Sequence, residues 1–327
     1  MRSITRAPLV AGLAFGAMAL GGCGGGDGAD PTTPASGTLN LRITDAPIDA
    51  AAEVVVVFTG LELHGASGDD VRIDFPNPRS IDLLKLQDGV TSALTDGLTV
   101  PAGDYQWMRL IVSAEKNSQS SSYIKLLTGE QYPLWIPSGA ESGLKLMRPF
   151  TVAQGGTTRL LIDFDLRKSI TAPPGQDPNY IMRPALRVLD ELQAGTIEAT
   201  VDLAALAAAQ LGEGAPVGEC AAGVYLFAGG AATPDDQDGE EADGADPVVY
   251  EPVAYDGANT TVTATIPFVA VGTYTLAATC DFDVDAADLN DYDAAASDGA
   301  PGFETMRWTI LDNVSVTANA TTAVTLP

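Results

Sequence analysis

The chain has 327 residues and carries 43 acidic against 17 basic side chains, which gives a net charge of −26 near neutral pH. This excess of carboxylates argues against nucleic acid as a partner, because phosphate backbones are bound by clustered Lys and Arg. The length exceeds that of an average single domain, so two domains of about 150 residues are expected.

The first 22 residues have the three parts of a bacterial secretory signal. Arg2 and Arg6 give a positive start, and the uncharged run 7–20 follows. That run is too short to cross the hydrocarbon of a bilayer, which takes about 20 residues of helix. It ends at Leu20-Gly21-Gly22-Cys23, which resembles the lipobox of bacterial lipoproteins. We therefore predict a signal peptide over 1–22 and lipid attachment at Cys23; an ordinary cleaved signal with an incidental cysteine is the alternative.

The lipoprotein resemblance implies that Cys23 carries a thioether-linked diacylglycerol, and two acyl chains anchor a protein stably. The membrane is then a partner through this N-terminal lipid. Gly24, not Asp, follows the cysteine, and by resemblance to lipoprotein sorting in diderm bacteria this favours the outer membrane of the cell envelope. Residues 23–36 consist of small and polar residues after the cysteine, so we predict a flexible tether there.

The distribution of charge places the expected domain boundary. Residues 37–192 carry 14 basic and 19 acidic side chains, whereas residues 193–327 carry one basic residue, Arg307, and 22 acidic ones. Two regions of similar length and such different charge are most simply two domains. The acidic region would be repelled by anionic lipid headgroups, and its carboxylates suit solubility, a salty medium or divalent cations.

The apolar residues of 37–192 recur with period two between turn residues, as Leu39, Leu41 and Ile43 do. This pattern is typical of an all-β sandwich or barrel. We predict an all-β protein of two β-sandwiches, Ig-like or prealbumin-like, with one helical turn at 166–170 and with 80–86 as either a strand or partly a helical turn. The other strands expected in this region are 39–43, 53–63, 71–73, 106–114, 123–127, 144–152, 157–165 and 180–189.

Five ordered motifs in this region carry a family resemblance. They are Leu39-x-Leu-x-Ile-Thr-Asp-Ala-Pro47, Ile81-Asp-Leu-Leu84, Val100-Pro-Ala-Gly-x-Tyr105, Leu161-Ile-Asp-Phe-Asp165 with Ser169-Ile170, and Arg183-Pro184 with Arg187-Val188. Together they look like the DUF4382 family, a domain of unknown function found in bacterial lipoproteins. The resemblance covers most of residues 37–190 and implies no particular activity.

Several polar residues in these motifs could be structural or chemical. Asp45 precedes a proline turn, where capping and Asx-turn hydrogen bonds account for it; a polar site at the strand end is the alternative. Asp163 and Asp165 share one strand face, which predicts a solvated face with surface ion pairs, with a metal site as the alternative. Tyr105 follows a turn and resembles the tyrosine of sandwich corners, whose hydroxyl bonds nearby backbone.

The region 193–327 also reads as strands, with Ala-rich residues 203–210 expected to form two helical turns. Its Val271-Gly-Thr-Tyr274 repeats the Gly-x-Tyr step that ends at Tyr105. A strand, a Gly-x-Tyr turn and a second strand are similar to transthyretin-like or carboxypeptidase-regulatory-like sandwiches. The strands expected here are 196–202, 222–227, 248–255, 260–267, 272–280, 303–311 and 314–326.

Two cysteines, Cys220 and Cys280, lie in the acidic region. An exported protein meets oxidising conditions, and a pair of cysteines in one domain then indicates a disulfide. Closing a loop of about 60 residues would stabilise the fold by roughly 4 kcal/mol in the chain-entropy model. Two buried free thiols are the alternative.

Two acidic segments, 234–246 and 281–293, interrupt the strands of this region. Calcium takes six to eight oxygen ligands, so clustered carboxylates at turns are candidates. An EF-hand register fails, because Ala286 stands where glycine is needed and Tyr292 where glutamate is needed. A calcium site of another type stays a hypothesis beside a solvated acidic loop that keeps sheet edges from pairing. The candidate ligands are Asp281, Asp283, Asp285 and Asp288.

The sequence contains no recognisable catalytic motif. His64 is the single histidine, and no G-x-S-x-G step accompanies it as a hydrolase would require. We therefore expect a non-enzymatic binding, structural or adhesion module, with an envelope protein or a glycan as its ligand. The alternative is a carbohydrate-active or other hydrolytic enzyme, since paired carboxylates can cleave glycosides.

Overall fold

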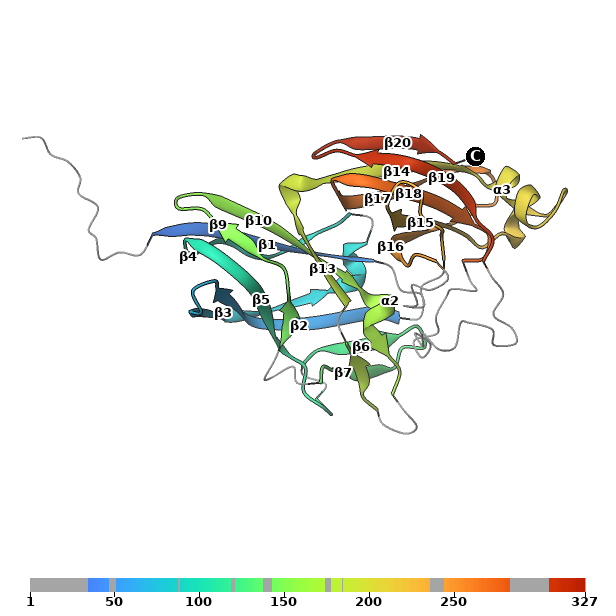
Figure 1. The fold of residues 1–327 in the computed structure, drawn as a ribbon. Helices are drawn as coiled ribbons and strands as arrows, with labels where there is room; N and C mark the ends of the chain where they lie inside the picture. The colour runs from blue at the N-terminus through green and yellow to red at the C-terminus, as the bar shows by residue number, and fades with distance from the viewer. Residues whose placement is uncertain are drawn as a thin grey trace, which may run out of the picture. The chain divides into compact units, whose positions relative to one another are not determined.

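The computed structural model describes residues 35–46, 51–87, 89–118, 121–137, 143–173, 178–183, 185–235, 244–282 and 306–326. The signal peptide, Cys23 and most of the tether therefore lie outside the described residues. As predicted, the described part is all-β, with strands that form four sheets (Figure 1). No helix in the described ranges has the length and apolar character needed to cross a membrane.

The strands up to Asp190 form two sheets. In one, β13 and β1 flank β10, and β4 completes the order β13-β10-β1-β4; in the other, the order is β11-β12-β7-β6-β2-β5-β8, with β3 paired to β2 and β9 to β5. The strands are β1 (Ser36–Ala46), β2 (Ala51–Gly65), β3 (Asp70–Asp82), β4 (Ser92–Pro101), β5 (Gly103–Ser113), β6 (Tyr123–Leu126), β7 (Gln131–Trp135), β8 (Leu144–Leu146), β9 (Phe150–Val152), β10 (Thr157–Asp165), β11 (Ile170–Thr171), β12 (Tyr180–Met182) and β13 (Ala185–Asp190), with η1 (Leu83–Leu86) and α2 (Leu166–Ser169) between them.

Side chains from both of these sheets share one core, which makes this part a sandwich. Leu39, Leu41 and Ile43 of β1 are fully buried, as their alternation predicts. Phe58 of β2 meets Phe164 of β10 edge to face, with ring centroids 6.3 Å apart. Full burial of an apolar side chain of this size contributes roughly 1.5–3 kcal/mol, so this alternating set supplies the main driving force for the first sandwich.

Strand β3 departs from the expectation of a break at Pro76-Asn77-Pro78. It is an edge strand that pairs with β2 alone, and an edge strand tolerates proline because one side of it needs no ladder donor. The register jumps from Gly60–Asp74 to Phe58–Arg79. The proline-containing residues 75–78 are therefore accommodated as a bulge, which bends the strand without ending it.

Strand β4 is not among the strands expected from the sequence, and it contains Asp96-Gly97, a dipeptide typical of turns. The dipeptide lies where the pairing of β4 with β1 shifts register between Leu39 and Leu41. Gly97 adopts a positive φ of 70°, and its N–H donates to the Asn40 side-chain carbonyl at 2.7 Å. The residues that suggested a turn thus form an irregularity within a continuous strand.

The strands after Glu191 form the second sandwich, with sheets of order β17-β14-β20 and β16-β15-β18-β19. Their facing sides share a separate hydrophobic core. Helix α3 covers the predicted residues, and Asp202 caps it by accepting hydrogen bonds from the N–H groups of Ala204 and Ala205. The elements are η2 (Glu191–Gln193), β14 (Ala194–Asp202), α3 (Leu203–Gln210), η3 (Val217–Glu219), β15 (Ala222–Ala228), β16 (Pro247–Val253), β17 (Thr261–Ala270), β18 (Gly272–Thr279), β19 (Thr309–Val316) and β20 (Thr321–Thr325).

The sheet that contains β15 is apolar on both faces. Tyr225 and Phe227 of β15 point away from the main core and pack with Tyr250 of β16 in a second, aromatic cluster. Phe282 and Trp308 complete this cluster, and the Trp308 ring meets Tyr225 edge to face at 5.1 Å. These two residues stand before and after residues 283–305 in the chain, so the described residues on either side of that span pack on the outer face of the sheet.

Candidate functional site

The two Gly-x-Tyr steps form equivalent corners. The Tyr105 hydroxyl donates to the Pro101 carbonyl at 2.7 Å, as predicted, and the Tyr274 hydroxyl donates to the Ala270 carbonyl at 2.8 Å. Burial raises the pKa of both phenols above the ordinary value, so both stay protonated donors near neutral pH. Each tyrosine fastens the start of a strand to the residue four positions earlier, which is a structural role.

The structure contradicts the prediction that Asp163 lies on a solvated face. Asp163 is 8% exposed, because β10 lies between β1 and β13 and its residues from Leu160 to Phe164 are all buried. Its carboxylate accepts a hydrogen bond from Nε of Arg187 at 2.9 Å and a second from Nη2. Arg187 is the register partner of Asp163 on β13. Asp163 therefore belongs to a nearly buried cross-strand ion pair on the face of β10 opposite Ile162 and Phe164, which pack in the core.

Thr44 and Asp45 at the end of β1 are both buried. The Thr44 hydroxyl lies 3.0 Å from the carbonyl oxygens of both Leu86 and Val90, which ties the strand end to the segment after η1. This contact agrees with the structural interpretation of the motif, although Pro47 lies outside the described residues.

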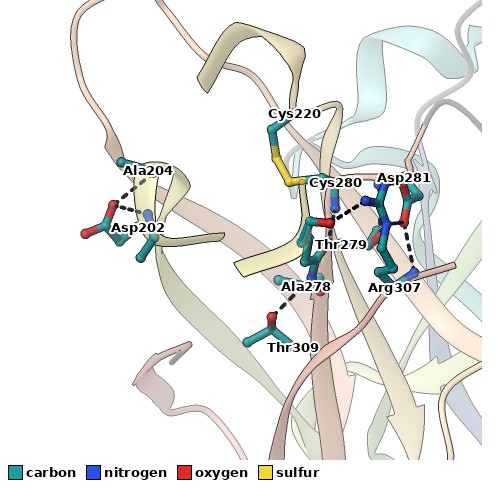
Figure 2. The surroundings of a disulfide bond; sticks show 11 residues. Asp202, Ala204, Cys220, Ala278, Thr279, Cys280, Asp281, Arg307 and Thr309 are labelled. Carbon is teal, nitrogen blue, oxygen red and sulfur yellow. Dashed lines mark hydrogen bonds and ion pairs between the residues drawn. A yellow bond between two sulfur atoms is a disulfide. The ribbon is translucent and has the colours of Figure 1, made fainter. Parts of the chain in front are cut away.

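The predicted disulfide is present between Cys220 and Cys280, whose Cα atoms are 4.5 Å apart. Cys220 follows the short helix η3, and Cys280 directly follows β18. The bond therefore joins the α3–β15 connection to the end of a central strand (Figure 2). It fixes the chain one residue before Asp281, where the second acidic segment begins.

Arg307 binds Asp281 on the other side of that segment. The backbone N–H and the Nε of Arg307 each donate to Oδ2 of Asp281 at 2.9 Å, and Nη2 contacts Oδ1. The Asp281 side chain is only 11% exposed. Burial alone would raise the pKa of Asp281, but the hydrogen bonds and charge of Arg307 lower it below the ordinary value. Asp281 is therefore ionised and held by the only basic residue of 193–327.

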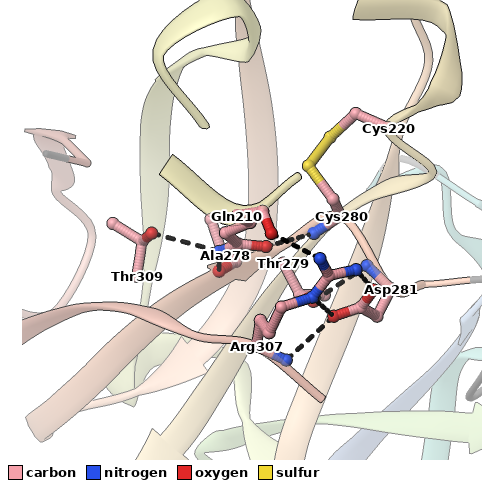
Figure 3. Close-up of polar contacts among 8 residues, drawn as sticks. All are labelled: Gln210, Cys220, Ala278, Thr279, Cys280, Asp281, Arg307 and Thr309. Atoms are coloured by element: carbon pink, nitrogen blue, oxygen red, sulfur yellow. Dashed lines mark hydrogen bonds and ion pairs between the residues drawn. A yellow bond between two sulfur atoms is a disulfide. The ribbon is translucent and has the colours of Figure 1, made fainter. Parts of the chain in front are cut away.

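Gln210 at the end of α3 links the same region to two strands. Its Nε2 donates to the Ala278 carbonyl and to the Thr309 hydroxyl at 3.1 Å each, and its Oε1 accepts from the Cys280 N–H at 2.8 Å (Figure 3). Its own carbonyl accepts from Nη1 of Arg307. We call Gln210, Cys220, Cys280, Asp281 and Arg307 the loop-root cluster, because their contacts join the described residues just before and just after 283–305.

Of the four predicted calcium ligands, only Asp281 lies in the described part of the chain. Both of its carboxylate oxygens contact Arg307, so a cation there would compete with the guanidinium. Asp283, Asp285 and Asp288 lie outside the described residues. Within those residues, no group of three or more His, Cys, Asp or Glu could hold a metal ion. The calcium site stays a prediction.

A second polar cluster lies on the nine-stranded sheet, and sequence reasoning missed it. His64 of β2 stacks on Trp107 of β5, with centroids 4.7 Å apart and ring planes 9° from parallel. Its Nδ1 lies 2.5 Å from Oδ1 of Asp70 on β3. These residues are register partners, His64 with Trp107 and His64 with Asp70. The histidine is therefore part of a cross-strand row and not an isolated surface residue.

The adjacent row is Arg72, Glu62, Arg109 and Lys145, on β3, β2, β5 and β8 in that order. Nη1 of Arg109 lies 3.2 Å from Oε1 of Glu62. Nζ of Lys145 lies 4.1 Å from the Trp107 ring centroid, and Cζ of Arg109 lies 5.1 Å from it. We call His64, Trp107, Arg109 and Lys145 the Trp107 face.

The Trp107 face could have been found only through strand register. Glu62 and His64 alternate along one strand, as Trp107 and Arg109 do along another, and this parity indicates a polar face on each. Nothing in the sequence states which residue of one strand lies opposite which residue of the other, because turn length and bulges decide that.

Comparison with known families confirms the DUF4382 resemblance. Residues 36–184 contain a DUF4382 domain. Its description is a domain of unknown function, so the match fixes the module and assigns no activity to it. It covers nearly the whole span over which the five motifs resemble the family. The lipoprotein and transthyretin-like resemblances stay predictions.

Among solved structures, the chain is similar to a candidate cell adhesion protein from Bacteroides fragilis, at 12% identity and a TM-score of 0.19 over 88% of this chain and 92% of the other. It is also similar to a DUF3823 family protein from Bacteroides ovatus, at 11% identity and a TM-score of 0.13 over 74% and 89%. Likenesses at these scores carry no argument about fold or function. No curated protein matches the chain.

Proposed function

We propose that this chain is a lipid-anchored protein of the cell envelope that acts by binding a ligand, in a structural or adhesive role, and not by catalysis. The lipobox at Cys23 supports the address, with the outer membrane as its destination. The DUF4382 domain contributes a scaffold of unknown activity. An envelope protein or a glycan is the proposed class of ligand.

The loop-root cluster is the observation that carries the binding proposal. A disulfide, an ion pair and a glutamine side chain all act on Cys280, Asp281 and Arg307, the described positions just before and after residues 283–305. Segments that carry binding residues are commonly presented by a rigid scaffold. Three separate restraints on these positions support a binding role for the residues between them.

Catalysis has weaker support in the described residues. His64 contacts Asp70 and Trp107 there, and no serine or threonine hydroxyl in the described ranges bonds to it, as a nucleophile would. Hydrolysis assays on envelope polysaccharides and peptides test this half of the proposal. Turnover that a single carboxylate substitution abolishes would replace the binding proposal with the hydrolase alternative.

A substitution of Cys23 tests the part of the proposed function that concerns lipid anchoring. We expect Cys23→Ser to release the protein from the membrane fraction or to leave it as an unprocessed precursor, because no thiol remains to accept lipid. Incorporation of labelled fatty acid should be lost with it. Unchanged membrane fractionation of the variant would contradict lipid anchoring.

We also propose that 37–192 and 193–327 are separate domains. Each region has its own sheets and its own hydrophobic core, and their charges differ strongly. Expression of 35–192 and of 193–327 as separate chains tests the division. Cooperative unfolding of both fragments supports it, and failure of both to fold would contradict it.

A further inference from the structure

The starting observation is a pair of like charges at directly opposed positions of two strands. Arg109 on β5 is the register partner of Lys145 on β8. Opposed side chains on adjacent strands have Cβ atoms about 4.5–5.5 Å apart, and like charges there destabilise the sheet. If the two cations had no function, we would expect a neutral or acidic residue at one of these positions.

The described surroundings compensate this pair only in part. Glu62 binds Nη1 of Arg109, but the Nε of Arg109 is buried and has no acceptor among the described residues. The Lys145 side chain is exposed and rests on the Trp107 ring. None of the described carboxylates pairs with Lys145. Among the described residues, Lys145 therefore has no ion pair and Nε of Arg109 has no acceptor, and the two residues lie at opposed positions of neighbouring strands.

We propose that the Trp107 face binds a carboxylate group of an acidic polysaccharide between Lys145 and Arg109. This proposal rests on the binding function proposed above and names its ligand and its site. A carboxylate accepts from ammonium and guanidinium groups through short, charge-assisted hydrogen bonds. It would neutralise the charge of Lys145, which lies opposite the Glu62-paired Arg109.

The local pairing of charges points to Lys145 as the contact for an anion. Arg72 is paired with Asp74 and Arg109 with Glu62, whereas Lys145 has no ion pair among the described residues, and one carboxylate would give it one. The stacked rings of His64 and Trp107 next to the cations offer apolar area to the C–H groups of a sugar ring.

The test uses tetragalacturonate as the probe, with the full chain in detergent at low ionic strength. A calcium chelator is present, so that calcium cannot bridge the probe to the acidic loops. Titration calorimetry measures affinity, and indole fluorescence reports contact with Trp107. We expect saturable binding that weakens about tenfold in Lys145→Ala, the effect of losing one charge-assisted contact, and that Lys145→Arg retains.

The chain offers a matched control. Lys116 lies 5.0 Å from the Trp135 ring centroid in the same sandwich, so Lys116→Ala removes a similar cation–π contact elsewhere and should leave binding unchanged. Melting midpoints and circular dichroism establish that each variant folds. If Lys145→Ala does not fold, Lys145→Gln, which keeps most of the side chain, replaces it.

Four results would overturn the proposal. They are absence of saturable binding, unchanged affinity in Lys145→Ala, equal loss in Lys116→Ala, and equal binding of maltotetraose, inorganic phosphate or tetraglutamate. The last comparison separates a polysaccharide site from a neutral-sugar, phosphate or acidic-peptide site. If the probe does not bind but the same preparation binds another envelope component, only the proposal for the Trp107 face fails. If the preparation binds no envelope component at all, the proposed binding function fails as well.

Discussion

Arg307 closes the root of the second acidic segment by donating to Asp281 through its backbone N–H and its guanidinium. The two residues are 26 positions apart in the sequence, and the segment between them begins and ends on the same face of the second sandwich. Arg307, the one basic residue beside the 22 acidic ones of 193–327, therefore joins the two chain positions on either side of this segment.

Replacing Arg307 by Ala should lower the free energy of unfolding by about 1–3 kcal/mol, because the nearly buried Asp281 carboxylate loses both guanidinium contacts and keeps only the backbone N–H of residue 307. Urea unfolding of the purified protein measures the change. Arg72→Ala is the matched control: its ion pair with Asp74 has side chains 57% and 69% exposed, and such pairs contribute at most about 1 kcal/mol. An equal effect of the two substitutions would contradict the role given to Arg307.

The same ion pair predicts a pH dependence. The pKa of Asp281 is lowered in the folded protein from its ordinary value of 3.8. Its contribution to stability is therefore fully present above the unfolded value and is lost as the pH falls through the lower folded value. Asp281→Asn should flatten the decline of the melting midpoint below about pH 4. If the melting midpoint of this variant fell in acid as steeply as that of the unchanged protein, Arg307 would not stabilise the charged form of Asp281.

The Asp163–Arg187 pair should behave as a buried ion pair. Its side chains are 11% and 28% exposed, and removing one partner of a buried pair costs about 3–5 kcal/mol. We expect Asp163→Leu or Arg187→Met alone to destabilise strongly, and the double variant to be milder than either because no charge is left unpaired. Chemical unfolding of the three variants measures this. Additive losses would contradict an interaction between the two residues.

The calcium hypothesis predicts a rise of the melting midpoint with added calcium and a fall with chelator, because a cation that binds only the folded protein stabilises it by mass action. Asp285→Asn should remove the response, whereas Asp256→Asn, in an exposed turn whose backbone bonds hold that carboxylate, should leave it. Magnesium serves as the comparison ion. Identical midpoints with calcium and with chelator would remove the hypothesis.

The strands that could be predicted are those whose buried side chains alternate, such as β1 and β10, and helix α3 with its Asp202 cap. The errors fall where tertiary pairing overrides local signals. The strand expected at 71–73 continues through Pro76 and Pro78, because β3 pairs with β2 alone and an edge strand tolerates proline. Strand β4 was not expected, and its Asp96-Gly97 forms a register shift inside the strand. The local sequence indicates which residues can bend a strand. It does not indicate whether pairing with a neighbouring strand keeps the strand continuous.

The candidate sites were predictable to different degrees. The pairing of Cys220 with Cys280 followed from having two cysteines in one region, and it is present. The partners of Asp281 and Asp163 did not follow, because Arg307 and Arg187 reach them through strand pairing that no local pattern encodes. His64 was interpreted as isolated for the same reason. The chemistry of a side chain can be read from the sequence, but the residue that lies opposite it on the neighbouring strand cannot.

The central claim is that the protein binds a component of the cell envelope without turning it over. The most direct measurement presents residues 35–327, which contain every described element, to an array of envelope glycans and to an envelope protein extract, while released products are assayed in the same wells. We expect saturable binding to a restricted set of components with no product. Product release, or no binding above that of an unrelated protein of equal charge, would contradict it.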